Sequence, residues 1–147
     1  MAMAWIPYSI IGFCLLFCVP LARAANITAS GGWSKTFGPG DLTGGAGSDI
    51  SSSYESGETA TVLNVTATAL WKVTIVRDDW AKGGLKVRES GQEYKDIPVS
   101  PAPAIDFITG YSGDKSGIEC QYQLSGVSIK DGPDTYETIV TYTVADQ

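Results

Sequence analysis

Apolar and polar residues alternate with a period of two in one segment after another of this sequence, and no segment carries the helical periodicity of about 3.6 residues. Successive side chains of a strand point to opposite faces of a sheet, so the alternation predicts strands that each bury one face. The fold is therefore expected to be all-β. The candidate strands are residues 26–30, 33–37, 60–68, 71–77, 85–88, 105–109, 118–124, 127–129 and 136–144.

The turns between these segments favour a β-sandwich. Turn residues recur at intervals of about 8 to 12 residues, which is the spacing typical of that architecture. Because some of the nine candidate segments are short, we expect only about seven or eight of them to form strands. These strands form one antiparallel β-sandwich that spans residues 25–147. Gly31 and Gly32 predict a bend or bulge after the first strand. The short connection at Ala69 and Leu70 predicts a hairpin between the strands on either side of it.

Two longer stretches do not follow the alternation. Residues 38–57 are rich in Gly and Ser, which favour irregular backbone, and Leu42, Ile50 and Tyr54 are placed to pin this loop to the core. Residues 97–103 contain three prolines. Because proline cannot donate to a strand ladder, this stretch is expected to be an edge or a loop that crosses between sheets.

The first 24 residues have a different character from the rest. An apolar run ends in Ala22-Arg23-Ala24, which is the layout of a secretory signal peptide with cleavage after Ala24. No Lys or Arg precedes the run and Pro7 and Pro20 interrupt it, so an uncleaved membrane anchor is the alternative. A spanning helix needs about 20 apolar residues and this run is shorter. We therefore expect a signal peptide at residues 1–24 and a secreted protein, extracellular or at the cell surface.

The charge of the remaining chain limits its partners. Residues 25–147 carry nine Lys and Arg against sixteen Asp and Glu, a net charge of −7. The basic residues are not clustered, so the chain lacks the electrostatic footprint that a nucleic acid or an anionic lipid surface requires. Neither nucleic acid nor, after signal cleavage, a membrane is expected as a partner. The acidic residues are scattered, as on an ordinary solvated surface.

Only one cysteine remains after Ala24, which excludes an intramolecular disulfide. Cys120 lies within residues 118–124, where apolar and polar residues alternate strictly. The pattern places its side chain on the inward face of a strand, and a buried structural thiol is favoured over a reactive one.

The most specific local pattern is Asp-Gly-Pro-Asp-Thr-Tyr at residues 131–136, followed by Glu-Thr-Ile-Val-Thr-Tyr-Thr-Val. It resembles the turn and tyrosine that open a strand in immunoglobulin-like sandwiches, where the tyrosine hydrogen-bonds back to the turn. The segment is similar to the closing strand of immunoglobulin-like domains in bacterial surface and pilus-type proteins. The resemblance covers the last third of the chain and lacks the paired cysteines of antibody domains. It implies an immunoglobulin-like sandwich in which Tyr136 is structural.

The sequence contains no histidine, which removes the commonest general base, the commonest zinc ligand and every Ser-His or Cys-His pair. Paired carboxylates remain conceivable for glycosidase chemistry, and Asp78 and Asp79 beside Trp80 are the place to look. Neighbouring residues on a strand point to opposite faces, and neighbouring acids on a turn are ordinarily solvated. We therefore expect no enzyme and no cofactor, and a small secreted enzyme would need a carboxylate pair facing a cleft.

Calcium and glycans are the remaining ligand classes. The turn aspartates do not follow the spacing of a calcium loop, so they are read as turn formers; they are Asp41, Asp49, Asp114, Asp131 and Asp134. Trp33 and Trp80 would be platforms for stacking sugars if their rings were exposed on one face. Trp71 alternates with Val73 and Ile75 and is read as core.

The segment after the expected cleavage site is a candidate for assembly; it consists of Asn26, Ile27, Thr28, Ala29 and Ser30. It has strand-forming residues and carries no charge or proline to block an edge. Such a strand pairs within its own sheet or is donated to the next subunit, and the sequence leaves both open. Donation is head-to-tail and builds an open filament.

The sequence thus predicts a secreted structural protein that self-associates into a filament, a pilus-like fibre or a surface layer through strand exchange or edge-strand pairing. The alternative is a secreted carbohydrate-binding or adhesin module.

Overall fold

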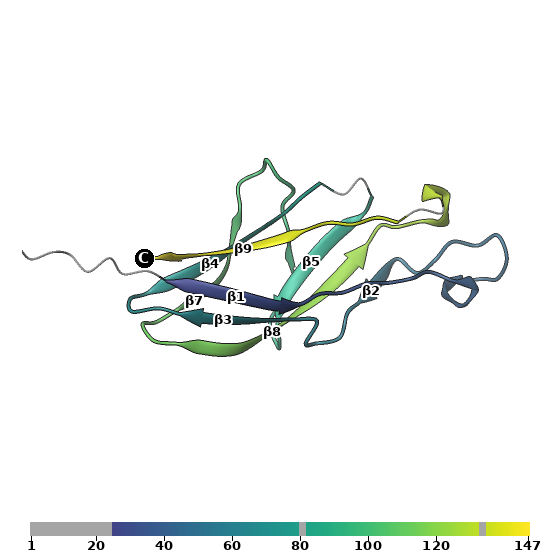
Figure 1. Cartoon of the computed structure of the whole chain (residues 1–147). Coiled ribbons are helices and arrows are strands. Elements are labelled where there is room, and N and C mark those ends of the chain that lie inside the picture. Colours follow the sequence, from purple (N-terminus) through teal and green to yellow (C-terminus); the bar gives the residue numbers. More distant parts are fainter. Residues whose placement is uncertain (1–24, 80–81, 133–134) are drawn as a thin grey trace, which may run out of the picture.

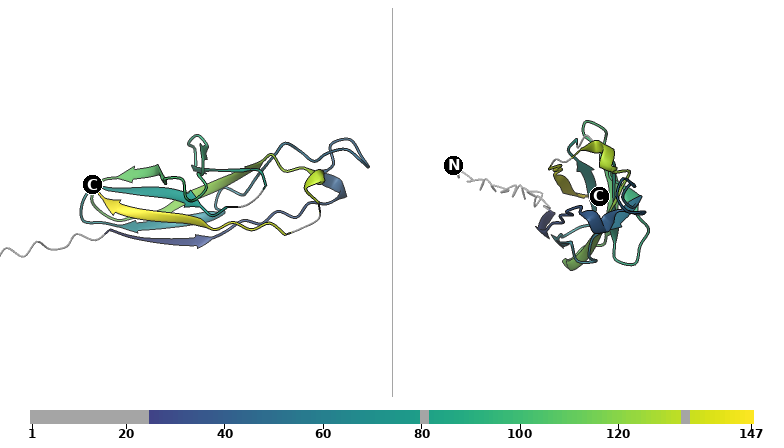
Figure 2. Two further views of the ribbon diagram at one scale, coloured as in Figure 1. Left: turned by 90° about the horizontal axis from the view of Figure 1, so that it is seen from above. Right: turned by 90° about the vertical axis from the view of Figure 1, so that its right-hand side faces the viewer.

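The computed structural model describes residues 25–79, 82–132 and 135–147, which form an elongated all-β domain (Figures 1 and 2). The described residues contain nine strands and two 3₁₀ helices of three residues each. Two of the nine strands are only two and three residues long. The expected signal peptide lies outside the described residues.

The larger sheet is antiparallel throughout and places β1 at one edge. Its order is β1 (Asn26–Gly31), β3 (Thr61–Thr66), β8 (Lys115–Ser125), β5 (Gly84–Glu89) and β6 (Lys95–Asp96), and β2 (Ser53–Glu55) pairs with one end of β8. β8 is the longest strand and pairs with β3, β2 and β5.

The smaller sheet has β4 in its centre. Its order is β7 (Ile105–Gly110), β4 (Trp71–Arg77) and β9 (Val140–Asp146), again antiparallel. β4 covers the residues expected from the sequence, because strict alternation buries Trp71, Val73 and Ile75 while the residues between them stay partly exposed.

One core lies between the two sheets, so the domain is a β-sandwich. The buried side chains come from both sheets and are mainly aliphatic: Leu63, Val65, Ala67, Trp71, Val73, Ile75, Leu85, Val87, Ile97, Phe107, Ile108, Ile118, Cys120 and Tyr122. β3, β4, β5 and β8 supply every second residue, which is the alternation seen in the sequence, whereas β7 buries the neighbours Phe107 and Ile108.

The expected hairpin at Ala69 and Leu70 is wrong. β3 and β4 lie in different sheets, since β3 pairs with β1 and β8 whereas β4 pairs with β7 and β9. The connection therefore crosses from one sheet to the other, and Ala67 and Trp71 are buried on either side of it. Alternation shows which face of a strand is buried but not which strand lies beside it.

Two expected strands are also wrong. Residues 33–37 form no strand, because the ladder of β1 ends where the Gly32 amide donates to the Ala60 carbonyl at 2.7 Å. Residues 127–129 form none either; Ser128 accepts a hydrogen bond from the Lys130 amide and caps the 3₁₀ helix η2 (Ile129–Asp131).

Residues 97–103, which the sequence predicts to be either an edge or a loop that crosses between sheets, form the crossing. It connects β6 of the larger sheet to β7 of the smaller one. On the way, Arg77 donates its amide to the Pro98 carbonyl at 2.9 Å and accepts the Ser100 amide at 2.8 Å, so the crossing is fixed to the end of β4.

Candidate assembly site

β1 lies at the free edge of the larger sheet and is held mainly by its backbone. Within the described part of the chain it pairs with β3 alone, with Asn26 opposite Thr66 and Gly31 opposite Thr61. Its side chains are exposed except for Ile27, which is partly buried against the core. Of the two arrangements that the sequence leaves open, the single chain has the intramolecular one, and donation would require this ladder to open.

The end of β1 requires a glycine. Gly31 has a φ of 102°, and a Cβ at this position would overlap the carbonyl oxygen of Ala60. Gly32 has open space around it. The chain therefore leaves β1 through a junction that only glycine fits, followed by Gly32, where a Cβ would have space although the backbone amide is bonded to the Ala60 carbonyl.

β9 forms an edge of the smaller sheet near β1 (Figure 1). Among the described residues it pairs with β4 alone. Its inward side chains, Val140, Tyr142 and Val144, are only partly buried, whereas the facing positions Val73 and Ile75 of β4 are fully buried. The apolar interior is therefore less completely covered on the side where β1 and β9 meet.

A chain of hydroxyls lies beside this less covered side. The Tyr122 hydroxyl donates to Thr61 Oγ1 at 3.0 Å and lies 2.8 Å from the Tyr142 hydroxyl. Burial raises the pKa of both tyrosines. The hydroxyls are neutral in the physiological range, so the group joins the two sheets without burying a charge.

Cys120 and Trp71 are buried, and Tyr136 is partly buried. The Cys120 side chain is fully buried in β8, and burial raises the pKa of its thiol to about 12. Trp71 is buried in β4, where Gly110 lies directly against its indole and leaves no room for a Cβ. The Tyr136 hydroxyl donates to the Asp131 carbonyl at 2.9 Å, which is a bond back to the preceding turn.

Of the residues considered for glycan binding and for acid chemistry, the structure describes Trp33, Asp78 and Asp79. Trp33 is partly buried against the core, and Trp80 lies outside the described residues. Asp78 and Asp79 are exposed in the connection after β4. In the described ranges no group of three or more Cys, Asp and Glu is arranged to hold a metal ion.

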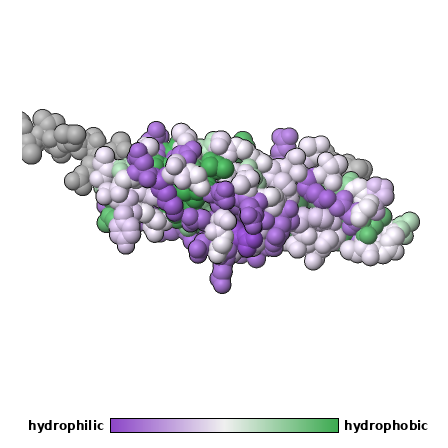
Figure 3. Space-filling model, turned by 90° about the horizontal axis from the view of Figure 1, so that it is seen from below, coloured by the Kyte–Doolittle hydropathy of each residue, from purple (hydrophilic) through white to green (hydrophobic). Residues whose placement is uncertain are grey.

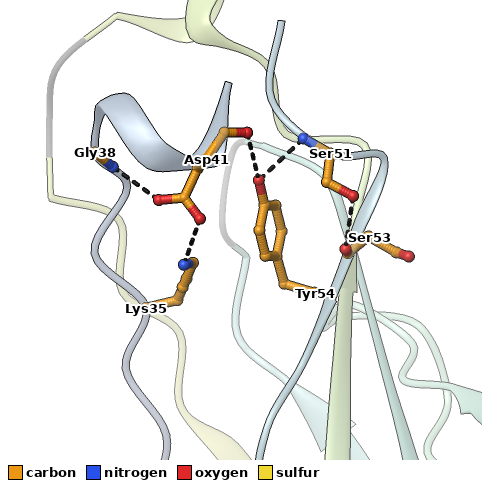
Figure 4. A network of polar contacts seen from close by, with 6 residues as sticks. All are labelled: Lys35, Gly38, Asp41, Ser51, Ser53 and Tyr54. Carbon is orange, nitrogen blue, oxygen red and sulfur yellow. Dashed lines mark hydrogen bonds and ion pairs between the residues drawn. The ribbon is translucent and has the colours of Figure 1, made fainter. Parts of the chain in front are cut away.

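The end of the molecule farthest from the start of β1 is ordered by polar contacts; we call it the tip, residues 35–53 and 127–132 (Figure 2). Lys35 Nζ lies 2.6 Å from Asp41 Oδ1, and the Gly38 amide donates to Asp41 Oδ2 at 2.9 Å. Tyr54 accepts the Ser51 amide at 2.9 Å and lies 3.4 Å from the Asp41 carbonyl oxygen, as Figure 4 shows. The hydrogen bond from Lys35 holds the pKa of Asp41 below its usual value.

Asp49 fastens the long loop of the tip to the turn around η2. Its carboxylate accepts the Ser128 hydroxyl at 2.7 Å and the Ile129 amide at 3.0 Å. Asp131 accepts the Ser128 amide at 2.9 Å and pairs with Lys82 at 3.2 Å. These hydrogen bonds, from the Ser128 hydroxyl to Asp49 and from the Ser128 amide to Asp131, lower the pKa of both carboxyls.

Leu42, Ile50 and Tyr54 are not placed as expected. Ile50 is buried, but it lies outside the main core cluster, and a bridge pairs it with Leu42. Tyr54 packs edge-on against Phe37, with 5.0 Å between ring centroids. Leu42 and Ile50 therefore pair with each other within the tip, and Tyr54 lies in β2 beside it, an arrangement that the composition of the loop did not indicate.

Comparison of the chain with protein-family models, with curated proteins and with solved structures finds no match. Across the residues described, no helix has the length and apolar character needed to cross a membrane. Function must therefore be argued from the edges, the tip and the exposed surface of the sandwich.

Proposed function

We propose that the protein is a secreted structural subunit of an extracellular filament, pilus-like fibre or surface layer, assembled through exchange or edge pairing of β1. The observation that carries the proposal is the state of β1. It is an edge strand with one partly buried side chain, and it ends at the Gly31–Gly32 junction.

Strand exchange costs little in such an arrangement. The six register pairs between β1 and β3 would re-form between two copies, and Ile27 would occupy the same place on the neighbour's core. Exchange of an identical element is a low-cost route to association. The free edge also carries no charged side chain that would oppose pairing with a second strand.

Strand order supports the pilus-type resemblance. With β2, β6 and β7 treated as additions, β1-β3-β8-β5 corresponds to sheet ABED of an immunoglobulin-like sandwich, and β4-β9 corresponds to strands C and F. In that fold strand F has a further neighbour, G. β9, in the F position, pairs only with β4 among the described residues, so its other edge suits a strand from a second copy.

A pair of cysteines distinguishes exchange from pairing within one chain. Thr28 and Asn64 are register partners on β1 and β3. Paired residues in antiparallel strands lie about 4.5 to 5.5 Å apart between Cα atoms, which is within the range of a disulfide. In an assembled sample of the Thr28→Cys/Asn64→Cys variant, exchange predicts a covalent ladder of multimers on non-reducing gel electrophoresis. The buried Cys120 thiol does not interfere.

The single variants Thr28→Cys and Asn64→Cys are the controls and should give no ladder. A fast-migrating monomer from filaments seen by electron microscopy would contradict exchange and leave edge pairing as the mode of assembly. Dispersed monomers at high concentration, for the unmodified protein and for the variants, would contradict the subunit proposal itself. A glycan screen would then test the binding-module alternative.

A further inference from the structure

β1 contributes less to the core than the strand that it pairs with. Among the described residues, none of its side chains is fully buried, and only Ile27 packs partly against the core cluster. Its neighbour β3 buries Leu63 and Val65 completely. On the face shown in Figure 3 hydrophilic residues predominate, so the apolar contacts of the domain are concentrated between its sheets. Departure of β1 would therefore break backbone hydrogen bonds and remove little apolar packing.

A side-chain hydrogen bond joins the two sheets on the side where β1 and β9 meet. It links the hydroxyl of Tyr122 in β8 to that of Tyr142 in β9, with 2.8 Å between the oxygens. The Tyr122 hydroxyl has one proton and donates it to Thr61 Oγ1 at 3.0 Å, so Tyr142 is the donor in the bond between the sheets. Thr61 is the register partner of Gly31, the last residue of β1. These bonds therefore lie near the end of β1 and use none of its atoms.

The opposite edge of the sandwich is held by a side chain as well. Lys95 of β6, in the larger sheet, donates from Nζ to the Asp106 and Phe107 carbonyls of β7, in the smaller sheet, at 3.1 and 2.8 Å. The ring of Phe107 lies 5.9 Å from the ring of Tyr142 between centroids, so β7 and β9 also contact each other through the core. The two sheets are thus connected at both edges by contacts that do not involve β1.

Burial makes the tyrosine pair costly to separate. Tyr122 is 6% exposed, so water does not readily replace a partner that its hydroxyl loses. Movement of β9 away from β8 would remove the donor Tyr142 from this buried oxygen. Departure of β1 would leave the bonds among Thr61, Tyr122 and Tyr142 in place. The pair therefore favours opening between β1 and β3 over opening between the sheets.

We propose that Tyr122 and Tyr142 form a latch that keeps the two sheets together when β1 leaves β3, so that strand exchange passes through an open but folded acceptor. The vacated edge of β3 then receives β1 of a second copy in the same register, and Ile27 of that copy takes the same place on the core. Without the latch, β9 would separate from β8 once β1 is gone, and the core would be exposed to solvent. The inference rests on the strand exchange proposed above and names the residues that regulate it.

A disulfide that holds β1 in place tests the latch. In a dilute, monomeric sample of the Thr28→Cys/Asn64→Cys protein, oxidation fixes β1 on β3 and reduction frees it. Tyr142→Phe is added to this protein, because it removes the hydroxyl and keeps the ring. Amide hydrogen exchange of β9 is then measured by mass spectrometry in both states. The latch predicts that Tyr142→Phe accelerates exchange in β9 several-fold more in the reduced protein than in the oxidised one.

Equal acceleration in the two states, or none in either, would overturn the latch. A hydroxyl that only stabilises the fold has the same effect whether or not β1 is free, so the difference between the states is the decisive readout. Tyr122→Phe removes the same bond from the other sheet and should reproduce that difference. Tyr136→Phe is the matched control, because its hydroxyl donates to the Asp131 carbonyl and joins no sheets. A difference of the same size in Tyr136→Phe would also overturn the proposal.

The covalent ladder separates failure of the latch from failure of strand exchange. A ladder from assembled Thr28→Cys/Asn64→Cys protein, together with equal acceleration of β9 in the two states, would refute the latch and leave the subunit proposal standing. If neither ladder nor filament forms, strand exchange is refuted and its regulation by the latch with it. A ladder together with acceleration confined to the reduced state supports both.

Discussion

In the body of the sandwich, mainly apolar and buried side chains join the two sheets, whereas in the tip the contacts that order the chain are hydrogen bonds and ion pairs on carboxylates near the surface. The two regions also differ in regularity. The body is a set of ladders, and the tip holds a 3₁₀ helix, η1 (Pro39–Asp41), and a bridge between Leu42 and Ile50. The irregular backbone of the tip is therefore held in one conformation, as the sheets are. Because its contacts are polar, the conditions that disrupt the tip differ from those that disrupt the apolar core of the body.

The largest effect is expected from a cavity in the body. Leu63 is fully buried in β3 between the sheets. Leu63→Ala should lower the free energy of unfolding by about 2 to 5 kcal/mol, because it loses apolar burial and leaves a void in a close-packed core. Denaturant unfolding measures this loss. Thr66→Ala on the exposed end of the same strand should change the value by less than about 0.5 kcal/mol, and equal losses would contradict the assignment of the core.

An intermediate effect is expected at the end of β1. Gly31→Ala forces a side chain into a left-handed conformation and against the Ala60 carbonyl, which should cost about 1 to 3 kcal/mol. Faster amide hydrogen exchange should appear in β1 and β3 before it appears in β4. Gly32→Ala is the matched control because a Cβ there meets nothing within 4 Å. If both variants behave alike, the junction is not confined as described.

The smallest effect, and the one that separates the regions most cleanly, is a pH response limited to the tip. The pKa values of Asp41, Asp49 and Asp131 are lowered in the folded chain, from an unperturbed value of 3.8. Their contribution to stability is therefore fully present above that value and is lost as the pH falls through the lower folded pKa values. Hydrogen exchange corrected for its intrinsic pH dependence should show the tip losing protection below about pH 4, with β4 and β8 unaffected.

Asp49→Asn is the control for this pH response. The variant cannot titrate at position 49, so it should loosen the turn around Ser128 and Ile129 already at neutral pH and show a smaller change on acidification. Simultaneous loss of protection in tip and body would mean that the two regions unfold together.

Many strands of the body could be predicted from the sequence, because the pattern that identifies a strand lies within the strand itself. The alternation predicted the bounds of β4 to the residue. The prolines limited residues 97–103 to an edge or a crossing between sheets, and the structure has the crossing. The alternation of apolar and polar residues does not indicate which strands lie side by side. For this reason the predicted hairpin at Ala69 and Leu70 was wrong.

The contacts between the two segments of the tip could not be predicted, because they join residues far apart in the chain. Asp49 accepts a hydrogen bond from Ser128, which lies 79 residues later, and the sequence around either residue does not predict this contact. Glycine and serine content predicted irregular backbone over residues 38–57, which is correct except for β2 at Ser53–Glu55. Composition does not indicate whether irregular backbone is held in one conformation. The contacts of Phe37 with Tyr54 and of the Ile129 amide with Asp49 were missed because both residues were predicted to end strands that do not form.

The buried thiol of β8 can be used to measure how often the body of the sandwich opens. Only thiolate reacts rapidly with disulfide reagents, and Cys120 is fully enclosed with its pKa raised to about 12. A thiol reagent therefore reacts with Cys120 only when the sheets separate. The labelling rate reports opening of the body alone, and a tip that loosens in acid would leave that rate unchanged.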